Sequence, residues 1–338
     1  MATPAVRALG AHFAGARLLS VHRPNIAGLL DGSPWSAASI ALDSRGPWSR
    51  RWPAVAWRLR REPVDLAVLF PNSFRSALVA RLGGCRRRAG FARYGRGPLL
   101  TDALPPRRDA AGRRFPSPVI DDYNRLAVYL GCPPPGHRME LFTTARDEEA
   151  AQAVWTQAGL GQFPEVICLN PGGAFGSAKH WPAEHFAALA RDLADRRGSG
   201  VLVLCGPGER EQARRIDALA GRPAVHALAD FPLSLGLTKA CVRRADLLVT
   251  TDSGPRHIAA AFGVPVVTLF GPTHIAWTET YQDRAVHLQK KVDCGPCQLR
   301  VCPLDHRCMR LLTPGEVFQA VVALRARFPG RAAGRSAG

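Results

Sequence analysis

The stretch 245–270 limits the fold of this chain more than any other. Residues 245–249 are apolar except for Asp246 and are rich in branched side chains, which predicts a strand buried on both faces. The stretch 255–263 begins with Pro, ends with Gly and carries small apolar residues at helical spacing, so a short helix is predicted there. Residues 264–270 predict a second buried strand. Strand, polar turn, helix and strand in this order are typical of an open parallel sheet.

The polar turn between these elements reads TTDSG and contains Asp252, Ser253 and Gly254. In open parallel sheets, ligands bind at the carboxyl ends of the strands, where the first turn of a helix offers unpaired N–H groups to anions. We therefore expect these three residues to line a binding site. Asp and Ser are also common N-cap residues, so a purely structural role for Asp252 and Ser253 is the alternative.

Alternating strand-like and helix-like segments run along the rest of the chain. Its length of 338 residues is greater than that of a typical domain with a single hydrophobic core, and it suits two α/β domains. Residues 131–138, dense in Pro and Gly, predict a linker. We expect one domain over 1–143, a second over 144–328, and a disordered tail over 329–338.

A second glycine-rich loop, NPGGAFGSAKH, follows the strand predicted at 165–170. Its glycines allow a tight turn and close approach of the backbone to a ligand, and Lys179 adds a cation, which suits a diphosphate. We expect Gly172, Gly173, Ser177 and Lys179 to contribute, although the loop matches no Walker A pattern and an ordinary connecting loop is the alternative.

A third loop, GPGEREQ, follows the strand predicted at 200–205 and contains Glu209 and Glu211. Either carboxylate would suit the hydroxyls of a ribose. Acidic residues are also favoured in the first turn of any helix, so a solvated first turn is the alternative for both.

The formal net charge is +18, and 41 of the 45 basic residues are Arg. Such a surface is attracted to anionic membranes, phosphorylated substrates or nucleic acid, although a coding bias toward Arg, Ala, Gly and Pro is an alternative cause. The Arg residues are scattered, which argues against a nucleic-acid partner. Clusters at 58–61 and 86–88 are candidates for a phosphorylated lipid or a membrane surface, or are simply solvated. No apolar stretch of 18 residues or secretion signal occurs, so we expect a cytoplasmic protein.

Four of the nine cysteines are crowded at spacings C-x2-C-x4-C-x5-C, namely Cys294, Cys297, Cys302 and Cys308. Four thiolates within 15 residues can close a tetrahedral structural zinc site, with His306 as an alternative fourth ligand. Reduced thiols or an adventitious disulfide are the alternatives. The other five cysteines stand alone, mostly among apolar residues, and are expected in the core.

Three motifs together resemble the ADP-heptose lipopolysaccharide heptosyltransferases of glycosyltransferase family 9, of the heptosyltransferase II type. They are NPGGAFGSAKHWPAEHFAALA, TTDSGPRHIAAAFGVPVVTLFGPT and DCGPCQLRVCPLDHRCMRLLTP. The resemblance implies a GT-B fold, with two Rossmann-like domains facing a cleft. It also implies inverting transfer of L-glycero-D-manno-heptose from ADP-heptose to heptosyl-Kdo2-lipid A at the cytoplasmic face of the inner membrane, with no metal cofactor in catalysis.

Carried over by motif, the resemblance assigns roles to the residues of the two loops. Lys179 would bind the donor phosphates and Asp252 would contact the heptose hydroxyls, and both would take part in catalysis. Ser253 and Gly254 would hold the diphosphate. His257 would support the loop or the phosphates, or else be a packed, hydrogen-bonded histidine.

The sequence departs from the family at its start. In the family a first strand ends in a Gly-Asp turn whose Asp is taken to deprotonate the acceptor hydroxyl, whereas this sequence opens directly on a predicted helix, MATPAVRAL. An inverting displacement needs such a base. We therefore expect the first domain to lack its first strand, the true start to lie upstream of Met1, and the chain as written to bind ADP with weak or absent transfer.

Two competing functions are compatible with parts of the sequence. A basic nucleic-acid-binding zinc protein would explain the charge and the cysteines but leaves both glycine loops unused. Another nucleotide-sugar enzyme of GT-B architecture would use the loops with a different donor.

Overall fold

The computed structural model describes residues 1–329 except 36, 44, 114, 174 and 175. The chain divides into two compact units. The first contains Met1–Met139 and Ala276–Glu279, and the second contains Glu140–Ile275 and the residues from Thr280 on. The predicted domain boundary between residues 143 and 144 lies just beyond this division. Apart from Pro329, the tail predicted over 329–338 lies outside the described residues.

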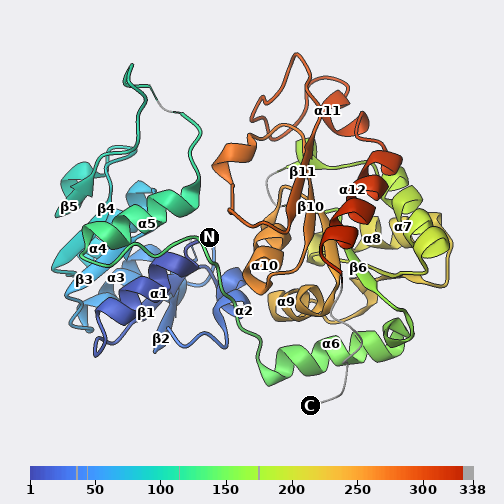
Figure 1. Ribbon diagram of the computed structural model, residues 1–338. Helices are drawn as coiled ribbons and strands as arrows, with labels where there is room; N and C mark the ends of the chain where they lie inside the picture. The colour runs from blue at the N-terminus through green and yellow to red at the C-terminus, as the bar shows by residue number, and fades with distance from the viewer. Residues whose placement is uncertain (36, 44, 114, 174–175, 330–338) are drawn as a thin grey trace. The chain divides into compact units, whose positions relative to one another are not determined.

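The first unit contains two separate parallel sheets, one of β1 and β2 and one in the order β3-β4-β5 (Figure 1). As predicted, the chain as written opens on a helix. The elements, with η for 3-10 helices, are α1 (Thr3–His12), β1 (Leu19–His22), η1 (Pro24–Ile26), α2 (Ala27–Leu30), β2 (Ala38–Ala41), η2 (Trp48–Arg50), α3 (Trp52–Arg60), β3 (Leu66–Leu69), α4 (Phe74–Leu82), β4 (Arg87–Phe91), η3 (Gly97–Leu99), β5 (Asp102–Leu104) and α5 (Val119–Tyr129).

Small aliphatic cores hold the first unit together. Leu9 of α1 packs with Ala89 of β4 and Ala127 of α5 in one cluster. A second cluster joins Val55 and Leu59 of α3 to neighbouring strand and helix residues. Burying such side chains removes apolar surface from water, and this is the main free energy that fixes the helices on the sheets.

The second unit is built on one six-stranded parallel sheet in the order β11-β10-β9-β6-β7-β8. Its elements are α6 (Ala145–Gln157), η4 (Leu160–Gln162), β6 (Val166–Asn170), η5 (Ser177–Lys179), α7 (Ala183–Arg197), β7 (Gly200–Val203), η6 (Pro207–Glu209), α8 (Arg210–Ala220), β8 (Val225–Ala227), η7 (Leu228–Asp230), α9 (Leu235–Arg244), β9 (Leu247–Thr251), α10 (Gly254–Phe262), β10 (Val266–Phe270), β11 (Ala285–Gln289), α11 (Arg307–Arg310) and α12 (Pro314–Arg327), with η8 (Ile275–Trp277) between the units.

Helices cover both faces of this sheet. Helices α7, α8 and α12 lie on one face, and α6, α9 and α10 lie on the other (Figure 1). Every residue of β6, β9 and β10 is buried, as the apolar runs of the sequence predict. The unit is therefore a doubly wound α/β domain. None of the helices in the described part of the chain is long and apolar enough to cross a membrane.

Candidate functional site

The candidate site lies where the strand order of the second sheet reverses. The chain goes from β6 outward to β7 and β8 on one side, and β9, β10 and β11 continue on the other side of β6. Strands β6 and β9 are direct neighbours, with Asn170 opposite Thr250. Both strands end at the same edge, so the loops after them meet there. A crevice at such a reversal is the usual ligand position in open α/β sheets.

Lys179 and Asp252, predicted from separate loops, contact each other at this edge. Lys179 Nζ donates to Asp252 Oδ2 at 2.6 Å and to the Asp252 carbonyl oxygen at 2.7 Å. Only 8% of Lys179 and 5% of Asp252 is exposed. The aliphatic stem of Lys179 is thus covered while its ammonium is fixed to the end of β9.

Two further side chains complete the environment of Asp252. Thr273 Oγ1 donates to Asp252 Oδ2 at 2.7 Å, and Arg256 Nη1 lies 3.3 Å from Asp252 Oδ1. Burial alone would raise the pKa of Asp252, but Lys179, Thr273 and Arg256 together hold it below its usual value. The carboxylate therefore stays ionised between two buried cations, and the group of three carries one net positive charge.

The buried amide of Asn170 ties the two loops together. Its Nδ2 lies 3.0 Å from Thr250 Oγ1, 3.0 Å from Ser253 Oγ and 3.1 Å from the Gly172 carbonyl oxygen. Thr251 Oγ1 also donates to Gly172 O at 3.0 Å. These bonds fix Gly172, at the start of the glycine loop, against the polar turn after β9.

Glu209 holds the glycine loop from the other side. Its carboxylate accepts from Gly173 N at 3.0 Å and from Gly206 N at 2.8 Å. A Cβ at Gly172 would lie 2.2 Å from Glu209 Oε1, so a larger residue there would displace the Glu209 carboxylate. The contact of Glu209 with a ribose stays a prediction. The same holds for Glu211, which is exposed in the first turn of α8.

The first turn of α10 is open at Gly254. This residue is exposed, and a Cβ there would meet no atom within 4 Å. Ser253 is the N-cap residue, in an extended conformation and without a side-chain capping bond to the helix. His257, one turn into α10, is half-buried, and its Nδ1 has no hydrogen-bond partner among the described residues. The arrangement leaves room at the helix terminus for an anion.

The segment 294–308, which carries the four crowded cysteines, packs against the glycine loop after β6 and against the turn after β10. Ala178 N donates to Arg300 O at 3.0 Å, and His306 Nε2 lies 2.7 Å from Ala178 O. Gln298 N donates to Pro272 O at 2.8 Å. The segment therefore holds the neighbours of Lys179 and of Thr273, the two side chains that share Asp252 Oδ2. Ser177, the first residue of η5, is exposed beside this contact.

The four cysteines differ in exposure. Cys308 is buried at the start of α11, Cys294 and Cys302 are half-buried, and Cys297 is exposed. Burial, and next the nearby thiols of the other three, raise the pKa of Cys308. Within the described ranges no three His, Cys, Asp or Glu side chains are close enough together to hold a metal ion. The zinc site stays a prediction. The five isolated cysteines are all buried, as predicted.

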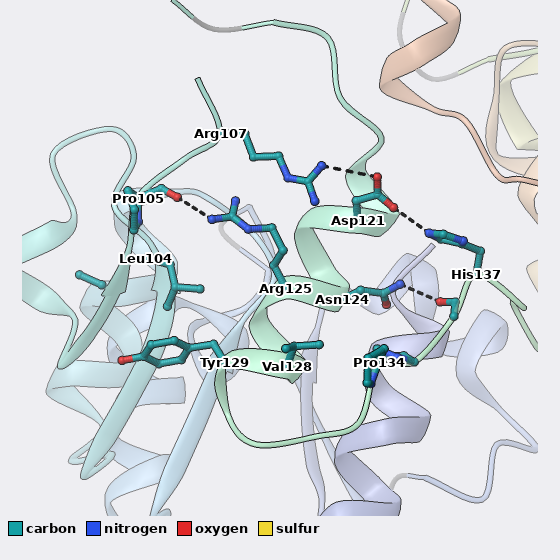
Figure 2. A pocket seen from close by; sticks show the side chains of 13 residues that line it. Leu104, Pro105, Arg107, Asp121, Asn124, Arg125, Val128, Tyr129, Pro134 and His137 are labelled. Carbon is teal, nitrogen blue, oxygen red and sulfur yellow. Dashed lines mark hydrogen bonds and ion pairs between the residues drawn. The ribbon is translucent and has the colours of Figure 1, made fainter. Parts of the chain in front are cut away.

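The first unit contains a separate groove, beside one face of α5 (Figure 2). It has a volume of about 600 Å³, with Leu104, Val128 and Tyr129 at one end. At the other end Asp121 Oδ1 lies 2.8 Å from His137 Nε2, and Asp121 Oδ2 lies 3.7 Å from Arg107 Nη1. Such a groove suits a ligand with an apolar face and polar substituents. Its residues are scattered in sequence and were not identified from the sequence pattern.

Three residues of the candidate site at the ends of β6 and β9 were not identified from the sequence either. Arg256 is only 1% exposed and lies in the first turn of α10, four residues after Asp252. That i,i+4 spacing is the signal that could have revealed it. Asn170, the last residue of β6, was recognisable as a polar residue ending an apolar strand. Thr273 follows a turn after β10, and no local pattern distinguishes it.

Comparison with known proteins gives a consistent result. A family model described as Glycosyltransferase family 9 (heptosyltransferase) matches residues 52–307, which is more than half of the chain. Lipooligosaccharide heptosyltransferase 2 of Campylobacter jejuni is 30% identical over 177 residues, covering 47% of this chain and 51% of that protein. Lipooligosaccharide heptosyltransferase 2 of Haemophilus influenzae is 30% identical over 239 residues, covering 67% and 65%. The matched part thus spans about half the length of the first relative.

The structural similarity extends over nearly the whole chain. The structure of Escherichia coli ADP-heptose lps heptosyltransferase II is 25% identical, has a TM-score of 0.76, and is matched over 96% of this chain and 94% of that one. The predicted fold class, α/β of the GT-B type, is confirmed by this match.

Proposed function

Because the chain belongs to glycosyltransferase family 9, the heptosyltransferases, we propose that it transfers L-glycero-D-manno-heptose from ADP-heptose to the heptosyl-Kdo2-lipid A inner core of lipopolysaccharide, with inversion. The observation that carries the proposal is the pairing of Lys179 with Asp252 where the strand order reverses. The solved relative named ADP-heptose lps heptosyltransferase II supports the choice of donor.

We propose that the donor diphosphate binds at the first turn of α10. The helix terminus contributes a partial positive charge, and the Lys179, Asp252 and Arg256 group adds one net positive charge beside it. When the sugar leaves, negative charge grows on the phosphate and an oxocarbenium-like sugar develops. Positive groups that are already ordered stabilise that leaving phosphate without reorganising, so the transfer itself would require no metal.

The tightly bonded state of Asp252 bears on its proposed role. Both of its oxygens already have cationic or hydroxyl partners. Its first task would therefore be to orient the Lys179 ammonium. An ammonium has three N–H donors, two of which bond Asp252. Contact between Asp252 and heptose hydroxyls would then use the remaining acceptor capacity of the carboxylate.

Replacing Gly254 tests the diphosphate position without touching the core. We expect Gly254→Leu to weaken ADP binding by about tenfold or more, because the new side chain fills the space at the helix terminus and removes contacts to a charged ligand. Since a Cβ there meets no atom within 4 Å, the melting temperature should not change. Isothermal titration with ADP measures the effect.

Gly315→Leu is the matched control. Gly315 lies in the first turn of α12, is exposed, and likewise has no atom within 4 Å of an added Cβ. It should leave ADP affinity unchanged. Equal affinities for wild type and Gly254→Leu would reject the binding position, and absence of ADP binding by the wild type would reject the proposed function.

Competition separates the two other functions. UDP-sugars that displace ADP efficiently would favour another nucleotide-sugar transferase of GT-B architecture. Salt-sensitive DNA binding that outcompetes ADP would favour the nucleic-acid-binding zinc protein. We propose instead the inner-core acceptor as partner, with peripheral contact to the anionic cytoplasmic face of the inner membrane and no nucleic acid.

We also propose that segment 294–308 binds one structural zinc ion through its four cysteines. Thiolates at this spacing suit tetrahedral zinc, and the thiols are near enough to raise the pKa of Cys308. Protein purified without a His tag should contain about one zinc per chain. Cys297→Ser, chosen because Cys297 is exposed, should lose it. Zinc far below one per chain would count against the site.

A further inference from the structure

One surface of the first unit combines tryptophan and arginine. Between Asp43 and Glu62 the sequence has six arginines and no acidic residue. Three tryptophans in the same stretch are exposed, by 64% for Trp48, 36% for Trp52 and 54% for Trp57. We call this surface the Trp–Arg face. It consists of Trp48, Trp52, Trp57, Arg45, Arg50, Arg51, Arg58, Arg60 and Arg61.

The local fold turns these side chains outward. Helix α3 buries Val55, Ala56 and Leu59, which fill the contact with α4 and the β2 strand. Trp57 lies on the opposite side of α3, whereas Trp52 lies at the N-terminal end of the buried side and is still 36% exposed, and Trp48 precedes the helix in η2. Of the other four tryptophans, Trp155 and Trp181 are buried, and Trp35 and Trp277 are half-buried. Three exposed indoles within ten residues leave a large apolar area in water, which is a mark of an interaction surface.

Three arginines of this face have side-chain contacts that do not neutralise their charge. Arg51 Nε donates to Gly46 O at 3.1 Å, and Arg60 Nε donates to Leu82 O at 2.7 Å. Arg61 Cζ lies 3.4 Å from the centroid of the Trp57 ring. Within the described part of the chain none of the six arginines pairs with a carboxylate, whereas about half of the other described arginines do, among them Arg17, Arg87 and Arg222. The face is therefore strongly positive.

A lipid surface fits this combination better than a nucleic acid. Indole side chains favour the headgroup level of a bilayer, and each basic residue near an anionic leaflet adds attraction. An amphipathic helix with aromatic and basic residues on its outer side is typical of interfacial binding. A base-stacking site needs open ring faces. One face of Trp57 is already covered by Arg61.

We propose that the Trp–Arg face seats the first unit on an anionic lipid bilayer, with the indoles at headgroup depth and the guanidinium groups on lipid phosphates. The inference rests on the proposed function in one respect, because that function requires an acceptor that is a membrane glycolipid. It adds to that function the surface that meets the membrane. Vesicle binding is measured without donor or acceptor, so its failure is distinct from a failure of heptose transfer.

Charge reversal provides the first test. We expect Arg50→Glu/Arg58→Glu to lower the partition coefficient onto vesicles of phosphatidylethanolamine and phosphatidylglycerol by at least about tenfold. Arg214→Glu/Arg215→Glu on α8 makes the same charge change on exposed arginines of the second unit. That control should bind nearly as wild type does. Equal loss in both pairs would mean non-specific attraction by net charge and would overturn the proposal.

Indole insertion provides the second test. Vesicles with brominated acyl chains should quench the fluorescence of the wild type, and Trp48→Phe/Trp57→Phe should lose most of that quenching. Both residues are exposed, so circular dichroism and melting should match the wild type. Quenching that persists in the double variant would overturn the proposal. So would wild-type protein that binds only neutral vesicles, or displacement of the protein from vesicles by single-stranded DNA that binds this face.

Discussion

Lys179→Met should lower ADP affinity by about tenfold to a hundredfold, because a hydrogen bond to a charged group is worth about 1.5–3 kcal/mol. Methionine keeps an unbranched, apolar stem in the buried space and removes the charge together with its N–H donors. Where heptose transfer is measurable, kcat should fall by about a hundredfold to a thousandfold, the usual effect of losing one preorganised donor to a developing anion. Titration calorimetry with ADP and a transfer assay measure the two effects.

A second buried lysine gives the control for this variant. Lys239 is 0% exposed in α9 and pairs with Asp147 at 3.3 Å, away from the loops after β6 and β9. Lys239→Met should destabilise the unit yet leave ADP affinity unchanged. If Lys179→Met lowers only the melting temperature, as Lys239→Met should, then Lys179 merely neutralises Asp252 and the proposed diphosphate contact is wrong.

Much of the fold could be predicted because its signals are local. The strands β6, β9 and β10 are apolar along their whole length, and the helices after them begin and end at Pro, Gly or capping residues. Strands β4 and β5 have no such local signal. β4 reads RRAGF, and β5 has three residues, so neither has an apolar period of its own. Their pairing in the sheet fixes them, which a local pattern does not reveal.

The site was predictable in part for the same reason. Lys179 and Asp252 belong to loops that follow apolar strands, and adjacent parallel strands bring such loops together. Their direct hydrogen bond could not be predicted, because it depends on how far η5 carries Lys179 back over the end of β9. Segment 294–308 contacts Ala178 in part through the backbone hydrogen bond from Ala178 N to Arg300 O, between residues more than a hundred positions apart, and backbone atoms carry no sequence signal.

Asp252→Asn should destabilise the second unit by about 3–5 kcal/mol, the usual cost of removing one partner from a buried ion pair. The amide leaves Lys179 and Arg256 as two buried cations without an anion between them. Asp230→Asn is the control. Its ion pair with Arg214 is more than half exposed, so its loss should change stability by less than about 1 kcal/mol. Denaturant unfolding followed by circular dichroism gives both values.

The dependence of this stability on pH identifies its source. The folded pKa of Asp252 lies below the ordinary value of 3.8, so its ionised form stabilises the wild type above that pH. The contribution is lost as the pH falls from 3.8 through the lower folded pKa. The wild type should therefore lose stability over this acid range, whereas Asp252→Asn should lose less, and the two curves should converge. Curves that stay parallel down to acid pH would show that the destabilisation comes from altered packing and not from the lost charge.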